Sequence, residues 1–150
     1  MDNLLLDTIG KKRVILENKI KIGHQLKDKY FKKMCRYNSV NNKFDTIILT
    51  TSTIGTTLII SAIPTTNPII TIIGATFTAI SAICSSLQKG VDTRNKYESY
   101  RNTFLQLNGL ITEYNSKLVQ NHITSDEYLE LIEHYNKEYQ LIIESALPIK

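Results

Sequence analysis

The sequence predicts an all-α protein in which a two-helix transmembrane hairpin carries long cytosolic helices that form a coiled or bundled domain. Two observations predict this fold class. Residues 46–88 form 43 consecutive positions without Asp, Glu, Lys, Arg or His. Residues 97–118 carry apolar side chains at alternating spacings of three and four, the pattern of a coiled helix. Such a composition argues for a small membrane protein with polar helical ends, and against a disordered chain or a disulfide scaffold.

The net charge of +4 is unevenly distributed and divides the chain into three parts. Residues 1–43, an amphipathic N-terminal helix, carry +7, and residues 44–88, the transmembrane hairpin, carry −1. The cytosolic helical hairpin follows at 89–150, where residues 125–150 carry −4. A basic segment beside a membrane span favours anionic lipid over nucleic acid as its partner, so we expect no nucleic-acid binding.

The N-terminal helix is predicted over residues 4–37, with one apolar stripe. Its basic charge complements the acidic last helix, and we expect the two to pack together; the alternative is that both charged faces are solvated. The stripe consists of Ile22, Leu26, Tyr30, Met34 and Tyr37, and the candidate contacts to lipid headgroups are Lys29, Lys32, Lys33 and Arg36.

The uncharged block divides into spans at 46–63 and 68–88, separated by a proline-containing turn at 64–67. Each span approaches the length that a bilayer core of about 30 Å requires. Pro68 suits the first turn of the second helix, where its missing N–H has no consequence. Helices are expected rather than strands because lipid leaves unpaired backbone groups unsatisfied. The alternative is a buried helical hairpin inside a soluble bundle.

The flanks of the hairpin predict its orientation. Lysine and arginine precede the first span and follow the second, whereas the turn is uncharged. Since positive flanks stay in the cytosol, both termini are expected to be cytosolic.

Hydroxyl side chains recur along both spans at helical spacing. Such residues either pack helix against helix, bonding across the contact, or line a water-filled pore in an oligomer. The absence of charge within the spans argues against an ion-selective channel or a pump. The candidate pore-lining or packing residues are Thr50, Thr53, Thr57, Thr71, Thr78 and Ser85.

A second helix is predicted to continue from Pro68 to about Gln120, with a bend at Gly90. Its cytosolic part carries the coiled seam, expected to be buried against the last helix or against a neighbouring subunit, with Leu105 and Leu110 flanking it. The seam residues, which are the candidate self-association residues, are Tyr100, Phe104, Leu107, Ile111, Tyr114 and Leu118.

The last helix is predicted to begin after a break at residues 121–123. Thr124 and Glu127 have the spacing of a capping box, and Pro148 ends the helix. Its apolar residues also alternate in spacings of four and three, so the last two helices should form an antiparallel pair. They are Tyr128, Ile132, Tyr135, Tyr139, Ile142 and Ala146.

Signatures of catalysis are not found in the sequence. The glycines are scattered, no Glu-x-x-His motif occurs, and the two cysteines, Cys35 and Cys84, are far from the histidines. We therefore expect no enzyme activity, no catalytic residue, no cofactor and no metal site.

The order of parts resembles the SLATT families. A basic helix leads through residues 36–44 into a Thr/Ser-rich span, a Pro/Asn turn follows, and the second span contains Ile-Ile-Gly-Ala-Thr-Phe-Thr-Ala-Ile-Ser-Ala at 72–82 before an aromatic-bearing helix at 97–101. The resemblance covers residues 20–145. It implies a membrane effector of nucleotide-signalled conflict systems that perturbs membranes as an oligomer.

The leading functional hypothesis is thus a membrane protein that oligomerises through its cytosolic helices and perturbs or perforates the bilayer. Its partners would be the lipid bilayer, further copies of itself, and a separate sensor or virion protein. One alternative is a non-catalytic structural or scaffold membrane protein, for instance of a large DNA virus, since the Asn, Lys and Ile bias fits an AT-rich genome. The other is a soluble all-α interaction protein.

Overall fold

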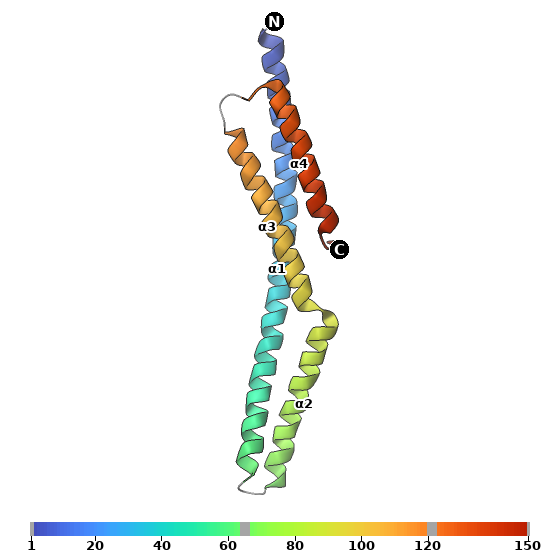
Figure 1. Ribbon diagram of the computed structural model, residues 1–150. Coiled ribbons are helices and arrows are strands. Elements are labelled where there is room, and N and C mark those ends of the chain that lie inside the picture. The colour runs from blue at the N-terminus through green and yellow to red at the C-terminus, as the bar shows by residue number, and fades with distance from the viewer. Residues whose placement is uncertain (1, 64–66, 120–122, 150) are drawn as a thin grey trace. The chain divides into compact units, whose positions relative to one another are not determined.

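The computed structural model describes residues 2–63, 67–119 and 123–149, and in these residues every regular element is an α-helix and none is a strand. Four helices follow in order: α1 (Asp2–Ala62), α2 (Pro68–Val91), α3 (Thr93–Leu118) and α4 (Ser125–Ser145), as Figure 1 shows. The predicted all-α class is confirmed. Most of the turn at 64–67 and of the break at 121–123 lies outside the described residues.

The chain forms two compact units, which we call the bundle unit and the hairpin unit. The bundle unit comprises Met1–Met34 and Glu98–Lys150, and the hairpin unit comprises Cys35–Tyr97. The sequence places the corresponding boundaries at 43/44 and 88/89, where the charge composition changes. The contacts change elsewhere because α1 is one uninterrupted helix of 61 residues that contributes to both units.

The predicted continuous helix from Pro68 to Gln120 is wrong. α2 ends at Val91, and Asp92 adopts a left-handed conformation with φ 53° before α3 begins at Thr93. The Asp92 N–H donates to the Lys89 carbonyl oxygen at 3.1 Å, closing the last turn. Aspartate tolerates this conformation better than most residues because its short polar side chain bonds locally. The break therefore falls two residues after Gly90, the expected bend.

In the hairpin unit, α1 and α2 cross at two glycines. A Cβ placed on Gly74 would lie 2.9 Å from the carbonyl oxygen of Gly55, and a Cβ on Gly55 would lie 2.9 Å from that of Gly74. Further along the same contact, the Ser81 hydroxyl donates to the Ile48 carbonyl at 3.2 Å. Backbones that approach this closely are typical of helix pairs packed in lipid.

The start of α2 follows the prediction. Pro68 lies in the first turn, and the Asn67 side chain caps the helix by accepting from the Ile69 N–H at 3.0 Å. Proline costs nothing at this position, because the first turn has no carbonyl for its N–H.

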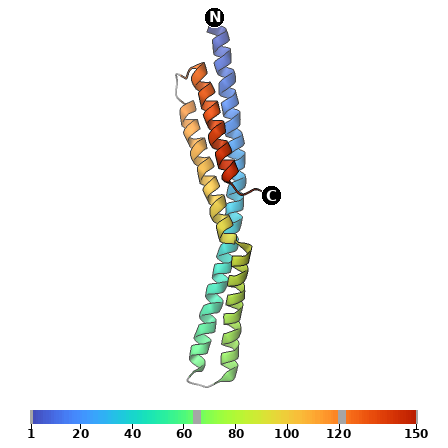
Figure 2. The same cartoon turned by 45° about the vertical axis from the view of Figure 1, so that its right-hand side comes forward.

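In the bundle unit, α3, α4 and the N-terminal half of α1 lie side by side (Figures 1 and 2). The antiparallel pairing of the last two helices is confirmed by their shared core. α1 packs against α4 in this core, as expected for the first and last helices, and the core contact is made by apolar side chains rather than by the basic and acidic residues that suggested the pairing. The core residues are Leu16 and Ile20 of α1, Leu110, Ile111 and Tyr114 of α3, and Tyr128, Ile132 and Tyr135 of α4.

Two sequence expectations about this core are wrong. Leu110 was expected to flank the seam but is only 5% exposed, because α3 is covered on two sides. Ile22 was assigned to the apolar stripe of the first helix but is 56% exposed. The buried stripe instead contains Leu16, Ile20 and Tyr30, since α1 carries apolar residues on two opposite faces and only one of them is covered.

The predicted capping box at the start of α4 is confirmed. Glu127 N–H donates to the Thr124 hydroxyl at 3.4 Å, and the Thr124 N–H donates to the Glu127 carboxylate at 2.7 Å. The Glu127 carboxylate accepts hydrogen bonds from the Thr124 N–H and from the Thr124 hydroxyl. Both bonds lower the pKa of Glu127, the N–H having the larger effect, because they favour the charged carboxylate.

Candidate membrane-spanning hairpin

Exposed apolar side chains cover the hairpin unit. Both α1, within Asp7–Ala62, and α2 contain a stretch long and apolar enough to cross a membrane, and only 6% and 11% of the residues in these stretches are buried. The core helix of a soluble protein is mostly buried, whereas exposed apolar side chains over such a length are typical of a helix that faces lipid or another molecule. The large exposed side chains are Ile47, Leu49, Ile54, Ile60 and Ile63 on the α1 side, and Ile69, Ile72, Ile73, Ile80, Ile83, Leu87 and Val91 on the α2 side.

Most hydroxyl groups within the two stretches donate to the backbone of their own helix. Thr51 donates to the Ile47 carbonyl at 2.7 Å, Thr57 to that of Thr53 at 2.9 Å, and Thr76 to that of Ile72 at 2.9 Å. Such bonds remove much of the penalty for placing a hydroxyl in lipid. The high Thr and Ser content is therefore compatible with spanning. The same bond is made by Thr46, Thr56, Ser61, Thr71, Thr78 and Ser86.

The threonine stripe predicted on the first span lies on the outside of the hairpin. Thr50, Thr53 and Thr57 are exposed. Because an α-helix turns by about 100° per residue, they lie roughly opposite Ile48 and Gly55, which contact α2. This stripe therefore does not pack α1 on α2 and points toward lipid, water or another molecule.

The stripe predicted on the second span lies beside the helix contact. The Thr78 hydroxyl is next to Gly55, since a Cβ placed there would lie 2.6 Å from it. Ser85 is half-buried and Thr71 is exposed. Sequence reasoning did not identify the glycines, although Ile48, Ser52, Gly55 and Ile59 share the alternating spacing of a contact face.

Polar contacts to α1 lie where the uncharged block begins and ends. The Gln88 amide of α2 donates to the Asp45 carboxylate of α1 at 2.9 Å. Beyond it, the amide of the buried Asn41 in α1 donates to the carbonyl of Thr93, the first residue of α3, at 3.4 Å. The first contact pairs α1 with α2 at the end of the apolar surface, and the second joins α1 to the start of α3.

The candidate headgroup residues all lie on α1. Lys29, Lys32 and Arg36 are exposed, and Lys33 is half-buried. Arg36 precedes Thr46 by ten positions, about 15 Å along a helix. An arginine this far before an apolar stretch can reach phosphate groups through its long side chain.

The structure places the coiled seam of α3 inside one chain. Tyr100, Leu107, Ile111 and Tyr114 are buried, and Phe104 and Leu118 are half-buried. Their rings contact α1 directly: Tyr30 and Tyr100 have centroids 5.9 Å apart, and Phe31 and Phe104 5.4 Å. The sequence left open whether the last helix or a neighbouring subunit covers this seam, and in the structure the chain's own helices cover it. Self-association would have to use another face.

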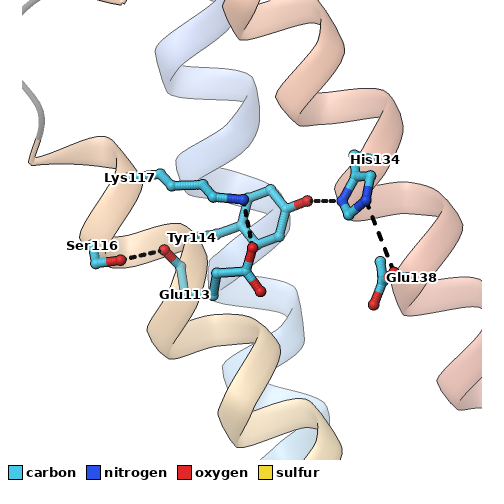
Figure 3. A network of polar contacts seen from close by, with 6 residues as sticks. All are labelled: Glu113, Tyr114, Ser116, Lys117, His134 and Glu138. Carbon is cyan, nitrogen blue, oxygen red and sulfur yellow. Dashed lines mark hydrogen bonds and ion pairs between the residues drawn. The ribbon is translucent and has the colours of Figure 1, made fainter.

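A polar network on the bundle unit joins α3 to α4 (Figure 3). The Tyr114 hydroxyl bonds His134 Nδ1, whose ring also faces Glu138, with Nε2 and Oε1 3.9 Å apart. Lys117 pairs with Glu113 and lies 4.7 Å from the centre of the Tyr114 ring. These contacts give the buried tyrosine hydroxyl a partner, which a buried polar group requires.

Burial raises the pKa of both Tyr114 and Tyr135 to about 12, and nearby Glu113 and Glu138 add to the shift for Tyr114. Burial also raises the pKa values of Tyr30 and Tyr139. Each of these hydroxyls therefore stays neutral to a higher pH than the hydroxyl of an exposed tyrosine, because ionisation would place a charge in the core.

Potential metal ligands are dispersed over the part of the chain that the structure describes. There, His, Cys, Asp and Glu do not gather in any group of three or more that could hold an ion. Comparison of the chain with protein-family models, curated proteins and solved structures returned no match.

Proposed function

We propose that this protein is an integral membrane protein whose hairpin unit crosses the bilayer twice and whose bundle unit lies in the cytosol. The observation that carries the proposal is that two stretches, each long and apolar enough to cross a bilayer, have only 6% and 11% of their residues buried, and that most of their hydroxyls are paired within their own helix. In water such a surface would cause aggregation, whereas in a bilayer the lipid tails solvate the apolar side chains.

Both termini are proposed to face the cytosol. Basic residues flank the hairpin at both open ends, including Lys43 before it and Lys89 and Arg94 after it. Positive flanks are retained on the cytosolic side, which leaves the turn on the opposite side.

The proposed activity is perturbation or perforation of the membrane by an assembly of several copies, as the SLATT resemblance implies. Support comes from the outward position of Thr50, Thr53 and Thr57. A face opposite the helix contact is free to meet water in an assembled state, and threonine hydroxyls would keep such a passage wet.

The test replaces Thr50, Thr53 and Thr57 together by valine, which keeps the side-chain volume. Dye release from liposomes should fall, because an apolar constriction dewets, while insertion is unchanged. The matched control replaces Thr51, Thr56 and Thr76, which do not belong to the stripe of Thr50, Thr53 and Thr57, and should release dye like the unaltered protein. Equal leakage from all three proteins would refute the pore-lining role.

A structural membrane protein without a pore is the second candidate. It is favoured by the Thr57 hydroxyl, which already donates to the Thr53 carbonyl at 2.9 Å and so does not require water. Liposomes that retain their dye at every protein density tested would select this scaffold role over the effector role.

A further inference from the structure

The bundle unit carries a basic outer face on α1. Exposed residues recur there at spacings of four and three. Between Lys11 and Lys32 three of them are lysines and none is acidic, and Asp7, one turn before, pairs with Lys11 at 2.6 Å. At about 100° per residue, this face lies roughly opposite the buried Leu16, Ile20 and Tyr30. It consists of Lys11, Ile15, Asn18, Ile22, Gln25, Lys29 and Lys32, with Val14 exposed at its edge.

An acidic outer face lies on α4 of the same unit. Its residues are also exposed at helical spacing, and they lie opposite the buried Tyr128, Ile132 and Tyr135. Four of the six are acids and one is a lysine. The face consists of Asp126, Glu130, Glu133, Lys137, Gln140 and Glu144, with Leu129 exposed at its edge.

Three hydrogen bonds fix the register of α1 against α4 within one chain. Lys12 Nζ donates to the Ser125 carbonyl, the Tyr135 hydroxyl to the Lys19 carbonyl, and the Tyr30 hydroxyl to the Leu147 carbonyl. The partners are 113, 116 and 117 positions apart in sequence. The two helices therefore run in the same direction, and a residue of α1 lies level with one about 115 positions later.

The same offset of about 115 positions also matches the two outer faces when the bundle unit of a second copy lies parallel to and alongside the first. Lys11 precedes Asp126 by 115 positions, as Lys29 precedes Glu144, which matches bases with acids. Val14 precedes Leu129 by the same number, which matches two exposed apolar side chains. Ile22 is level with Lys137, whose aliphatic stem can cover it.

We propose that the outer face of α1 in one copy docks on the outer face of α4 in a second copy. The contact is head-to-tail, because it uses different surfaces on the two copies, and therefore propagates into a ring or an open array. This inference rests on the proposed membrane anchoring, which brings the copies together in one membrane. Each exposed ion pair contributes little; confinement to one membrane raises the effective concentration of the partner.

Cysteine crosslinking of the full-length protein in liposomes tests the contact. With Cys35→Ser and Cys84→Ser as background, Asn18→Cys and Glu133→Cys proteins are reconstituted together and oxidised. The mixed dimer should exceed either homodimer by at least about tenfold, since the two residues are level but belong to different faces. Thr112→Cys, exposed on α3, replaces Asn18→Cys in the control. A predominant Asn18→Cys homodimer, or no excess over the control, overturns the proposal.

Charge reversal supplies the second arm. Lys11→Glu with Lys29→Glu should reduce the mixed dimer by about tenfold, and Asp126→Lys with Glu144→Lys in the partner protein should restore it. Unchanged crosslinking overturns the docking. If the reversal instead weakens only the interaction with anionic vesicles, the α1 face binds headgroups and the docking also falls.

Extraction of the same liposomes with alkaline carbonate separates the two proposals. Protein that remains in the membrane without the mixed dimer refutes the docking alone. Protein that is extracted refutes the anchoring on which the docking rests.

Discussion

Gly55 and Gly74 form a close approach between the two helices of the hairpin, since a Cβ on either glycine would lie 2.9 Å from the carbonyl oxygen of the other. The contact has no room for a side chain on either helix. It follows that the pairing of the helices is specified by the lack of side chains at these two positions, within an otherwise β-branched and aliphatic sequence.

Replacing either glycine by alanine should weaken the hairpin. Gly74→Ala inserts a methyl group against backbone, which should cost about 1–3 kcal/mol of stability. Gly90→Ala is the control, because a Cβ on Gly90 meets nothing within 4 Å; it should be neutral or stabilise by about 0.5–1 kcal/mol. Unfolding by SDS of the protein in mild detergent measures both, and equal effects of the two changes would contradict the close crossing.

Truncation of the seam should destabilise the bundle unit. Leu107→Ala, Leu110→Ala and Ile111→Ala should each cost about 2–5 kcal/mol, because all three side chains are buried. Leu105→Ala should cost much less, since Leu105 is 49% exposed. Thermal unfolding followed by circular dichroism gives the comparison. A Leu110→Ala variant as stable as Leu105→Ala would contradict the three-helix core.

The bundle unit should lose stability at alkaline pH. The pKa values of Tyr114 and Tyr135 are raised by burial to about 12, above the ordinary value of about 10 for an unfolded chain. A raised pKa means that the stabilisation is complete below about pH 10 and is lost as the pH rises toward 12. Tyrosinate absorbance and helicity should therefore change together over this interval. Ionisation without loss of helicity would contradict burial of the hydroxyls.

The orientation of the hairpin can be tested with a membrane-impermeant thiol reagent. In a Cys35→Ser, Cys84→Ser background, Ile63→Cys, at the end of the first span, should be labelled from outside the cell. Ser125→Cys, at the start of α4, should be labelled only after permeabilisation. Labelling of both from the same side would exclude the two-span topology.

Features set by neighbours in the sequence were the ones that could be predicted. The capping box of Thr124 and Glu127, the placement of Pro68, and the buried seam through Leu107 and Ile111 each depend on local spacing. The hydrogen bonds from Thr and Ser hydroxyls in the spans are local in the same way, because each donates to a carbonyl in the preceding turn of its own helix.

Features that depend on the pairing of distant segments could not be predicted. α1 has apolar residues on opposite faces, Leu16 and Ile20 on one and Ile15 and Ile22 on the other, and only the packing of α3 and α4 decides which is buried. The role of Gly55 depends in the same way on Gly74. Asp92 was missed because a glycine two residues earlier gave the stronger signal for a break.

Extraction with alkaline carbonate shows whether the hairpin unit spans a membrane. The treatment ionises tyrosines and should loosen the bundle unit, but the stretch from Thr46 to Gln88 contains no Asp, Glu, Lys, Arg or His and should stay in lipid. The protein should therefore remain with the membrane pellet and dissolve only in detergent. Recovery from the supernatant as a monodisperse protein in plain buffer would contradict this expectation.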